Sequence, residues 1–520
     1  MVYDRPKRKS IKVSVKRIRR FMRKTGIKYA LTADLATAME EKDKAFKAYK
    51  TAKLSAENWR NEHLESLAEA RARKNNTKVE TEIRKIKQVE QQRRQARAGK
   101  RMRKKLGQAG RVTRIYYTDE NGRRHECNTK RSIEEENEER FSQAENTPPM
   151  TQPLLDDLGY LAETEESRQI LDGVYEPSPV LGKYTKELLR ELRMPRAVKE
   201  KGPISIELSV DEHISAWKRQ RERTASEPSG LPFSHYKAGC EDEMIAEVDT
   251  LLRSIPYQQG FSPDEWQEIT DAMILKKAGV LDVEKMRTIQ LMHSAFNINN
   301  KKMARDVMKF AEALNLLARE QYGSRKFHQS IIAALNKRLT MDFLRQRRQA
   351  GAICSNDAKS CYDRIVHSIA ILAMMRLGLP AAPVQGMFKT LQGAAHKVST
   401  AFGVSTKAYG RGRKIPLQGG GQGNGAGACL WAVISTVIIC MMVTAGHGVN
   451  LLSAMSGTLI SFICYAFVDD TDVVHAGSDV YTSGEDVMRE MQVVVDRWEG
   501  GLRATGGALV PSKSYWYMID

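Results

Sequence analysis

The sequence is poor in cysteine, and its few cysteines lie far apart. The 520 residues contain seven, with no Cys-x-x-Cys pair and no cluster of cysteine with histidine (Cys127, Cys240, Cys354, Cys361, Cys429, Cys440 and Cys464). This scatter argues against a disulfide scaffold, a zinc finger and a thioredoxin-type site, and it favours a reducing compartment. The first residues, MVYDRPKRKS, also lack the apolar stretch of a secretory signal peptide. We therefore expect an intracellular protein.

Long, strongly apolar runs are scarce as well, with one exception at Ala426–Gly446 (AGACLWAVISTVIICMMVTAG). This run is long enough to span a bilayer. However, Gly-rich polar sequence precedes it and no basic flank anchors its C-terminal end. We interpret it as a helix buried inside a large domain and expect no membrane association.

The composition leaves room for a hydrophobic core. Hydrophobic residues make up 41% of the chain and charged residues 28%, which excludes a chain that is disordered throughout. At roughly 100 to 200 residues per domain, the length suits two or three domains. No period of self-similarity stands out, which argues against a solenoid.

Positive charge is in excess and falls in two blocks. Residues 1–115 hold 35 Lys and Arg against 12 Asp and Glu, and residues 301–414 hold 21 against 6. Between them, residues 116–300 are acidic, with 23 basic and 35 acidic groups. A single charged run is as well explained by a solvated face, but two blocks around an acidic insert favour a polyanion such as nucleic acid, contacted in two places.

The composition also suggests domain boundaries. Residues 1–32 form a basic arm, which is either a nuclear-import signal or a nucleic-acid tail, so the nucleus is slightly favoured over the cytoplasm. Residues 33–108 are rich in Ala, Glu, Lys, Arg and Gln, without proline, and predict extended basic helices. We interpret 109–204 as a mixed linker, with a hairpin signal at Asn121-Gly122. From 205 onward the pattern is denser and more apolar.

The most informative segment is Leu459–Val474 (LISFICYAFVDDTDVV). Its β-branched and aromatic residues run into Asp469-Asp470 and then resume at Val473, which predicts two strands joined tightly at the acidic pair. Asp is an ordinary turn residue. Two adjacent carboxylates after a deeply apolar strand nevertheless repel each other unless a cation compensates them.

A second carboxylate follows a short apolar strand that ends at Asp357. If this strand neighbours the predicted hairpin, Asp357, Asp469 and Asp470 converge. Three carboxylates form the hard oxygen set that Mg²⁺ prefers, and two such ions can activate an attacking 3′-hydroxyl and stabilise a leaving pyrophosphate. We interpret Asp363 as a structural residue and Asp472 as a turn residue.

These residues carry a resemblance to the reverse transcriptases of non-LTR, LINE-like retroelements. NDAKSCYD (Asn356–Asp363) resembles their motif A, and FVDD (Phe467–Asp470) resembles their motif C. The other similar segments, in the family's order, are SEPSGLPFSHYK (Ser226–Lys237) and LKKAGVLDVEKMRTIQL (Leu275–Leu291) of the fingers, EQYGSRK (Glu320–Lys326), motif B at LQGGGQGNGAGA (Leu417–Ala428), and motif D at GGALVPSKS (Gly506–Ser514). The resemblance covers roughly residues 205–520. The chain departs from the family pattern where Thr288 replaces a proline, Ser324 an aromatic, and Gly427-Ala428 a frequent Ser-Pro.

The resemblance implies an α/β (α+β) right-hand fold, with fingers at 205–350, a palm with an antiparallel sheet at 351–520, and a basic, mostly helical region before them. It implies RNA-directed DNA synthesis, with an RNA template, a DNA primer and deoxynucleoside triphosphates as partners. Two Mg²⁺ ions, or Mn²⁺ in their place, are the implied cofactors. No thumb follows motif D, so we expect a C-terminally truncated protein.

The resemblance also assigns roles to individual residues. Asp357, Asp469 and Asp470 would hold the metal ions, and Lys513 would donate a proton to pyrophosphate. The other implied residues bind substrate: Tyr362 as a steric gate against ribonucleotides, Arg287 with Lys276 or Lys277 on the triphosphate, and Gln422 with Gly423 beside the nascent base pair. The ordinary alternatives are a core aromatic for Tyr362, surface charge for the cations and a flexible loop for the glycine segment.

Two other functions remain open at this stage. One is a catalytically inactive retroelement remnant that only binds nucleic acid. The other is an RNA-dependent RNA polymerase, against which Tyr362 and the FVDD sequence both count, since the latter family usually has Gly-Asp-Asp.

Overall fold

The computed structural model describes residues 114–119, 121–129, 132–133, 135–136, 152–221, 229–231, 233–276, 280–359, 361–400, 402–453 and 455–519, with Asn58 and Glu62. The chain divides into two units, 1–110 and 111–520, and the fold below is that of the second. The expected basic arm and nearly all of the expected helices at 33–108 lie outside the described residues, and so does Lys277.

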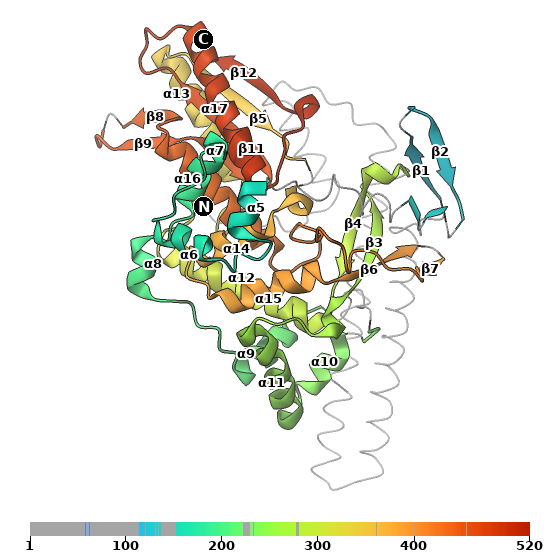
Figure 1. Ribbon diagram of the computed structural model, residues 1–520. Helices are drawn as coiled ribbons and strands as arrows, with labels where there is room; N and C mark the ends of the chain where they lie inside the picture. Colours follow the sequence, from blue (N-terminus) through green and yellow to red (C-terminus); the bar gives the residue numbers. More distant parts are fainter. Residues whose placement is uncertain are drawn as a thin grey trace, which may run out of the picture. The chain divides into compact units, whose positions relative to one another are not determined.

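The described fold is a mixed α/β one (Figure 1). The helices are α5 Gln152–Leu158, α6 Glu165–Asp172, α7 Lys183–Glu191, α8 Arg196–Lys201, α9 Val210–Lys218, α10 Phe233–Gly239, α11 Glu243–Gln259, α12 Ser294–Ala313, α13 Ser330–Arg347, α14 His367–Met375, α15 Ala381–Gln392, α16 Gly427–Thr444 and α17 Gly484–Ala504. The strands are β1 Ile115–Thr118, β2 Arg124–Cys127, β3 Glu268–Leu275, β4 Met286–Leu291, β5 Gly351–Asn356, β6 Ala395–Thr400, β7 Gly403–Val404, β8 Val449–Leu452, β9 Leu459–Phe462, β10 Cys464–Phe467, β11 Asp470–Ala476 and β12 Tyr515–Ile519.

One sheet carries the predicted acidic residues. Its strand order is β10-β11-β5-β12, and every neighbouring pair is antiparallel. Because side chains alternate along a strand, Cys354 of β5 enters the main core on one face while Ile353 packs on the other face with Leu344 of α13. Helices α14, α16 and α17 contribute to the main core, and Figure 1 shows α17 running along β11 and β5. Core residues thus pack on both faces of the central strands β5 and β11.

A second sheet, β4-β3-β6-β7, is mixed, because β3 and β6 are parallel while the other pairs are antiparallel. Its buried Asp271 is hydrogen-bonded by the Tyr409 hydroxyl and lies 3.2 Å from Nδ1 of His396. Strands β6 and β7 come from the range expected to be palm, yet they extend the sheet of β3 and β4. The boundary expected at residue 350 therefore does not separate the two sheets.

The region interpreted as a linker differs from that expectation. The Asn121-Gly122 signal does lie between paired strands, β1 and β2. Residues 152–204, however, include the four helices α5 to α8, and Leu158, Leu188 and Leu192 are fully buried in the main core. The leucines in this range have helical spacing, but the turn-rich sequence near them favoured the prediction of a linker.

The long apolar run forms α16, the one described helix long and apolar enough to cross a membrane. Of its most apolar window, 78% is buried within the protein, in contact with α7, α14 and α17. This packing agrees with the interpretation of a core helix and is compatible with the absence of a membrane.

The predicted pair of strands at 459–474 is divided further than expected. Leu459–Phe462 forms β9, which pairs with β8, and only Cys464–Phe467 and Asp470–Ala476 form the hairpin of β10 and β11. Asp472 is not a turn residue: it lies within β11 opposite Ser355, and its carboxylate pairs with Lys337 at 2.8 Å. Its structural role is an ion pair.

Candidate active site

The three predicted carboxylates come together at one end of the first sheet. Asp357 directly follows β5, and Asp469 and Asp470 lie in and after the turn between β10 and β11. The register pairs Thr471 with Asn356, so the next residues outward, Asp470 and Asp357, flank the same strand ends. Residues more than a hundred positions apart thus meet because an antiparallel hairpin lies beside β5.

The neighbouring carboxylates act electrostatically on Asp470. Burial raises the pKa of Asp470, and the charges of Asp469, Asp357 and Asp472 raise it further, in that order. Like charges that share a site disfavour ionisation unless a cation compensates them. The donors are all hard carboxylate oxygens, so by charge and by ligand type this strand end fits Mg²⁺ or Mn²⁺.

The three carboxylates do not form a preorganised metal site in this structure. Among the described residues, no group of three or more histidine, cysteine, aspartate or glutamate side chains stands at metal-ligating distances. Instead, Nζ of Lys513 lies 3.1 Å from Oδ2 of Asp357. The Lys513 side chain is 57% exposed, so this pair is a surface contact of small energetic weight, and Asp357 can exchange it for another cation.

The turn that carries Asp469 is strained at Val468. Phe467 pairs with Asp470, which leaves a two-residue loop, and Val468 has φ of 62°. A positive φ at the first loop position matches a type II′ hairpin, in which glycine is usual. A β-branched residue there is strained and persists only where its surroundings impose the conformation.

Gln321, from the EQYGSRK segment, holds Val468 in this strained conformation. The Gln321 side chain is buried, and its Nε2 donates to the carbonyl of Val468 at 3.1 Å while its Oε1 accepts from the Val468 N–H at 3.0 Å. Nε2 also donates to Oγ of Ser435 and Oε1 also accepts from the N–H of Gly323. All four hydrogen-bonding positions of the amide are therefore used, which fixes its orientation. Sequence reasoning missed this role, because nothing local links residue 321 to residue 468.

Two further contacts close the same turn. The indole N–H of Trp431, from α16, also donates to the carbonyl of Val468. Gly323 lies against the turn so closely that an added Cβ would stand 2.2 Å from the backbone nitrogen of Val468. Only glycine fits at this position, whatever its φ.

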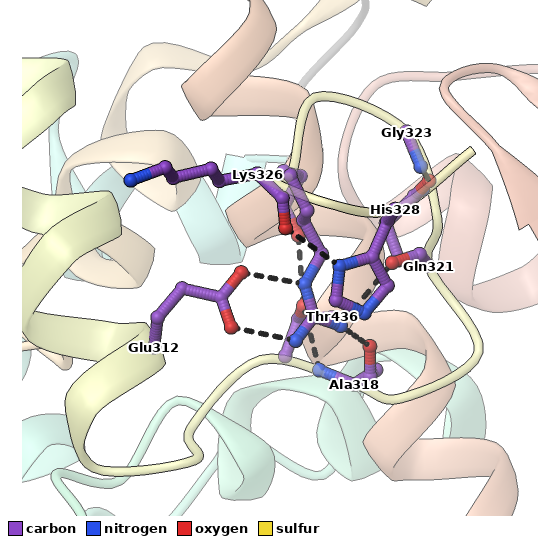
Figure 2. A network of polar contacts seen from close by, with 9 residues as sticks. Glu312, Ala318, Gln321, Gly323, Lys326, His328 and Thr436 are labelled. Carbon is purple, nitrogen blue, oxygen red and sulfur yellow. Dashed lines mark hydrogen bonds and ion pairs between the residues drawn. The ribbon is translucent and has the colours of Figure 1, made fainter. Parts of the chain in front are cut away.

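The loop that presents Gln321 is itself held by Arg325. Figure 2 shows the polar contacts around it: Glu312 receives two hydrogen bonds from the guanidinium, at 2.7 and 2.8 Å, and the carbonyls of Ala318 and Gln321 receive others. The Arg325 side chain is only 9% exposed. The hydrogen bond from Arg325 is the largest cause that lowers the pKa of Glu312.

We expect Arg325→Met to lower the free energy of unfolding by about 3 kcal/mol, because Glu312 loses its ion-pair partner and the carbonyl of Gln321 loses its hydrogen bond from Arg325. The exposed Arg319 on the same loop offers a matched control, and Arg319→Met should change the free energy of unfolding by less than about 0.5 kcal/mol. Urea unfolding measures both. Since the pKa of Glu312 is depressed, its contribution is present above the ordinary pKa of glutamate and is lost as the pH falls through the lowered value. The difference between wild type and Arg325→Met should accordingly shrink in acid; a constant difference would contradict this pairing.

Tyr362 lies between the carboxylates and α16. Burial raises its pKa, and so do the charges of Cys361 and Asp469. Its ring is 6.4 Å from that of Trp431, measured between centroids, and a Cβ on Gly427 would lie 3.8 Å from it. Tyr362 thus lies near both Asp469 and Trp431, whose indole N–H donates to the hairpin turn.

The glycine-rich segment before α16 is anchored to β4. The carbonyl of Gln422 accepts from the N–H of Gln290 at 2.7 Å, and the Gln422 amide donates to Asp363 at 3.1 Å. Gly423 has φ of 129°, and a Cβ there would stand 2.3 Å from the carbonyl oxygen of Gln290. The segment is a fixed connection between β4 and α16, and Asp363 has the structural role that was expected of it.

The predicted phosphate-binding cations lie on the second sheet. Arg287 is exposed on β4, three residues before Gln290, and Lys276 is exposed directly after β3. Among the described residues, neither cation forms a hydrogen bond or an ion pair with the three carboxylates.

Searches with this chain matched no protein-family model and no curated protein.

Proposed function

We propose that this protein is an RNA-directed DNA polymerase of right-hand type, related to the reverse transcriptases of non-LTR retroelements. The observation that carries the proposal is the meeting of Asp357, Asp469 and Asp470 at one end of an antiparallel sheet, where their charges act on one another. An acidic cluster is common on surfaces. A cluster presented by a strained turn, with three hydrogen bonds to Val468 and Gly323 packed against it, is costly to maintain without a function.

Asp357, Asp469 and Asp470 would hold magnesium ions, which would supply Lewis acidity at the primer 3′-hydroxyl and at the phosphate that it attacks. The chain's own residues position the reactants. Arg287 and the lysines near it bind the triphosphate of the incoming deoxynucleotide, and the Gln422–Gly423 segment borders the nascent base pair. Lys513, already beside Asp357, donates a proton to the departing pyrophosphate.

A second candidate function is nucleic-acid binding without synthesis. The ion pair between Lys513 and Asp357 favours it, because a cation of the protein occupies a carboxylate that a metal ion needs. The two functions share the basic blocks at 1–115 and 301–414, so RNA affinity should fall steeply with salt in both.

Primer extension distinguishes them. The full chain is incubated with a DNA primer on an RNA template, Mg²⁺ and either deoxynucleotides or ribonucleotides. Synthesis from deoxynucleotides supports the polymerase. Salt-sensitive RNA binding without extension, in either Mg²⁺ or Mn²⁺, supports binding alone.

We expect Tyr362→Ala to relax sugar selection. If the ring excludes a 2′-hydroxyl, its removal should raise ribonucleotide incorporation relative to deoxynucleotides by about 10- to 100-fold, a free-energy difference of about 1.4 to 2.8 kcal/mol. Tyr362→Phe is the matched control, because it keeps the ring and should keep the selectivity. Single-nucleotide incorporation with each triphosphate measures the ratio, and equal ratios in wild type and Tyr362→Ala would show that the ring has no such role.

A further inference from the structure

A large cavity lies away from the carboxylates, among α9, α10, α11 and the 3-10 turn η2 (Asp264–Gln267). Its volume is about 1180 Å³, and none of its described lining residues belongs to the candidate active site. Figure 1 shows α9, α10 and α11 grouped together. The aromatic rings of Trp217, Tyr236 and Trp266 line it, and the exposed side chains of Leu252 and Phe261 stand at its rim. Its size and apolar walls are those of a small-molecule site.

Three buried side chains of this cavity have polar atoms without partners. Arg253 is 3% exposed, and neither of its terminal nitrogens has a hydrogen-bond partner within the described part of the chain. The same holds for both ring nitrogens of His213 and for the indole nitrogen of Trp217, each residue being 1% exposed. Buried polar groups are nearly always paired, so three unpaired ones around one cavity call for an explanation.

The local structure fixes the guanidinium of Arg253 in place but leaves its two terminal nitrogens without hydrogen-bond acceptors among the described residues. Nε of Arg253 donates to Oδ1 of Asn299 at 3.0 Å, and the Asn299 amide returns a hydrogen bond to the Arg253 carbonyl. Burial lowers the pKa of Arg253 to about 10, so it is still charged at neutral pH. Asp249 also lines the cavity and is affected by the charge of Arg253, but it makes no hydrogen bond to it. The two terminal nitrogens are held ready for an acceptor.

The chemistry of the cavity narrows the class of ligand. Burial, with a smaller effect from Arg253, lowers the pKa of His213 to about 4, so its imidazole is neutral and offers one donor and one acceptor. The fork of a guanidinium matches the two oxygens of a carboxylate. The rings of Trp217 and Tyr236 are stacked face to face, with centroids 4.3 Å apart, and the half-buried Tyr236 is the ring of this pair that a flat ligand can cover. Among the lining residues, the exposed carboxylates of Asp264, Glu265 and Glu268 outnumber the exposed cation Arg411, which disfavours a polyanion such as a nucleic-acid backbone.

We propose that this cavity binds a small molecule with a flat aromatic body and a single carboxylate, the carboxylate on Arg253 and the body against Tyr236. The neutral His213 and the Trp217 indole N–H complete the hydrogen bonds to the carboxylate. This inference does not depend on the polymerase proposal, because the residues and helices that form the cavity are different from those that carry the carboxylates.

Binding of 2-naphthoate to the full chain tests the inference, by saturation-transfer NMR and by the shift in unfolding temperature. The uncharged 2-naphthamide has the same ring system and should bind at least about tenfold more weakly, as expected for the loss of one charge-assisted pair. Arg253→Met should abolish the preference for the acid. The change removes a buried charge whose two terminal nitrogens have no partner, which offsets the loss of the Nε hydrogen bond to Asn299, so we expect the variant to fold.

Arg376→Met is the matched control, since Arg376 is also buried with an unpaired Nε but does not line the cavity, and it should leave binding unchanged. Should Arg253→Met fail to fold, His213→Phe keeps a ring in place and should weaken 2-naphthoate several-fold. The inference is overturned if wild type does not bind 2-naphthoate at millimolar concentration, if acid and amide bind equally, or if a single-stranded RNA displaces the acid competitively.

Discussion

Asp469→Asn and Asp470→Asn are each expected to slow primer extension by about a thousandfold or more while leaving RNA affinity nearly intact. An amide keeps the size of the side chain but removes the negative charge that holds a divalent cation, and the loss of one group aimed at the reacting phosphate typically costs this much. Both residues are largely exposed, with Asp470 only partly desolvated, and the carboxylates repel one another, so neither change should lower the unfolding temperature in the absence of metal.

The control for this prediction lies on the same strand. Asp472 is two residues beyond Asp470, but its carboxylate is paired with Lys337, so Asp472→Asn should change the extension rate only a few-fold. If Asp472→Asn is as inactive as Asp470→Asn, general damage to β11 explains the loss. If Asp470→Asn extends primers at the wild-type rate, the carboxylates are not the catalytic centre.

Gln321→Leu is expected to have the second largest effect, although residue 321 does not face the substrate in the proposed mechanism. Leucine removes both hydrogen bonds to Val468: the carbonyl keeps its bond from Trp431, but the N–H is left without a partner, which costs about 1–3 kcal/mol. We expect the free energy of unfolding to fall by about 2–4 kcal/mol. Because the turn can then relax from its positive φ, kcat should fall by about 10- to 100-fold with little change in the KM for deoxynucleotides.

A compensating substitution separates positioning from a mere loss of stability. Val468→Gly allows the positive φ without strain, so in the Gln321→Leu background it should recover part of kcat. Gln349→Leu is the matched control, since that glutamine donates to Gly477 beyond the other end of β11. It should reduce stability by about 1 kcal/mol and leave kcat unchanged. Equal losses of kcat in Gln321→Leu and Gln349→Leu would refute a positioning role.

The position of the carboxylates was predictable because it follows from local patterns. A strand that ends in Asp357 and a hairpin that ends in Asp469 bring their acidic residues together as soon as the strands are neighbours, and pairing of β5 with β11 makes them so. The interpretation of α16 as a core helix was predictable in the same way, from the sequence on either side of it.

What could not be predicted depends on contacts between distant segments. The positive φ of Val468 gives no sequence signal, since valine is a poor choice for it, and its causes are Gln321 and Trp431, far away in the chain. The break between β9 and β10 at Ile463 falls inside an unbroken apolar run, because it depends on the partner strand β8. The helices α5 to α8 could not be predicted because turn-rich sequence adjoins them and their leucines are buried only against other parts of the core.

Metal-directed cleavage of the backbone tests the central claim most directly. Fe²⁺ replaces Mg²⁺ at oxygen-ligand sites, and with ascorbate and peroxide it cuts the polypeptide near the bound ion. The proposal requires cuts beside both Asp357 and Asp469-Asp470, which excess Mg²⁺ suppresses and Asp470→Asn removes. Cuts at only one of these two segments, or cuts that Mg²⁺ does not suppress, would contradict a shared metal site.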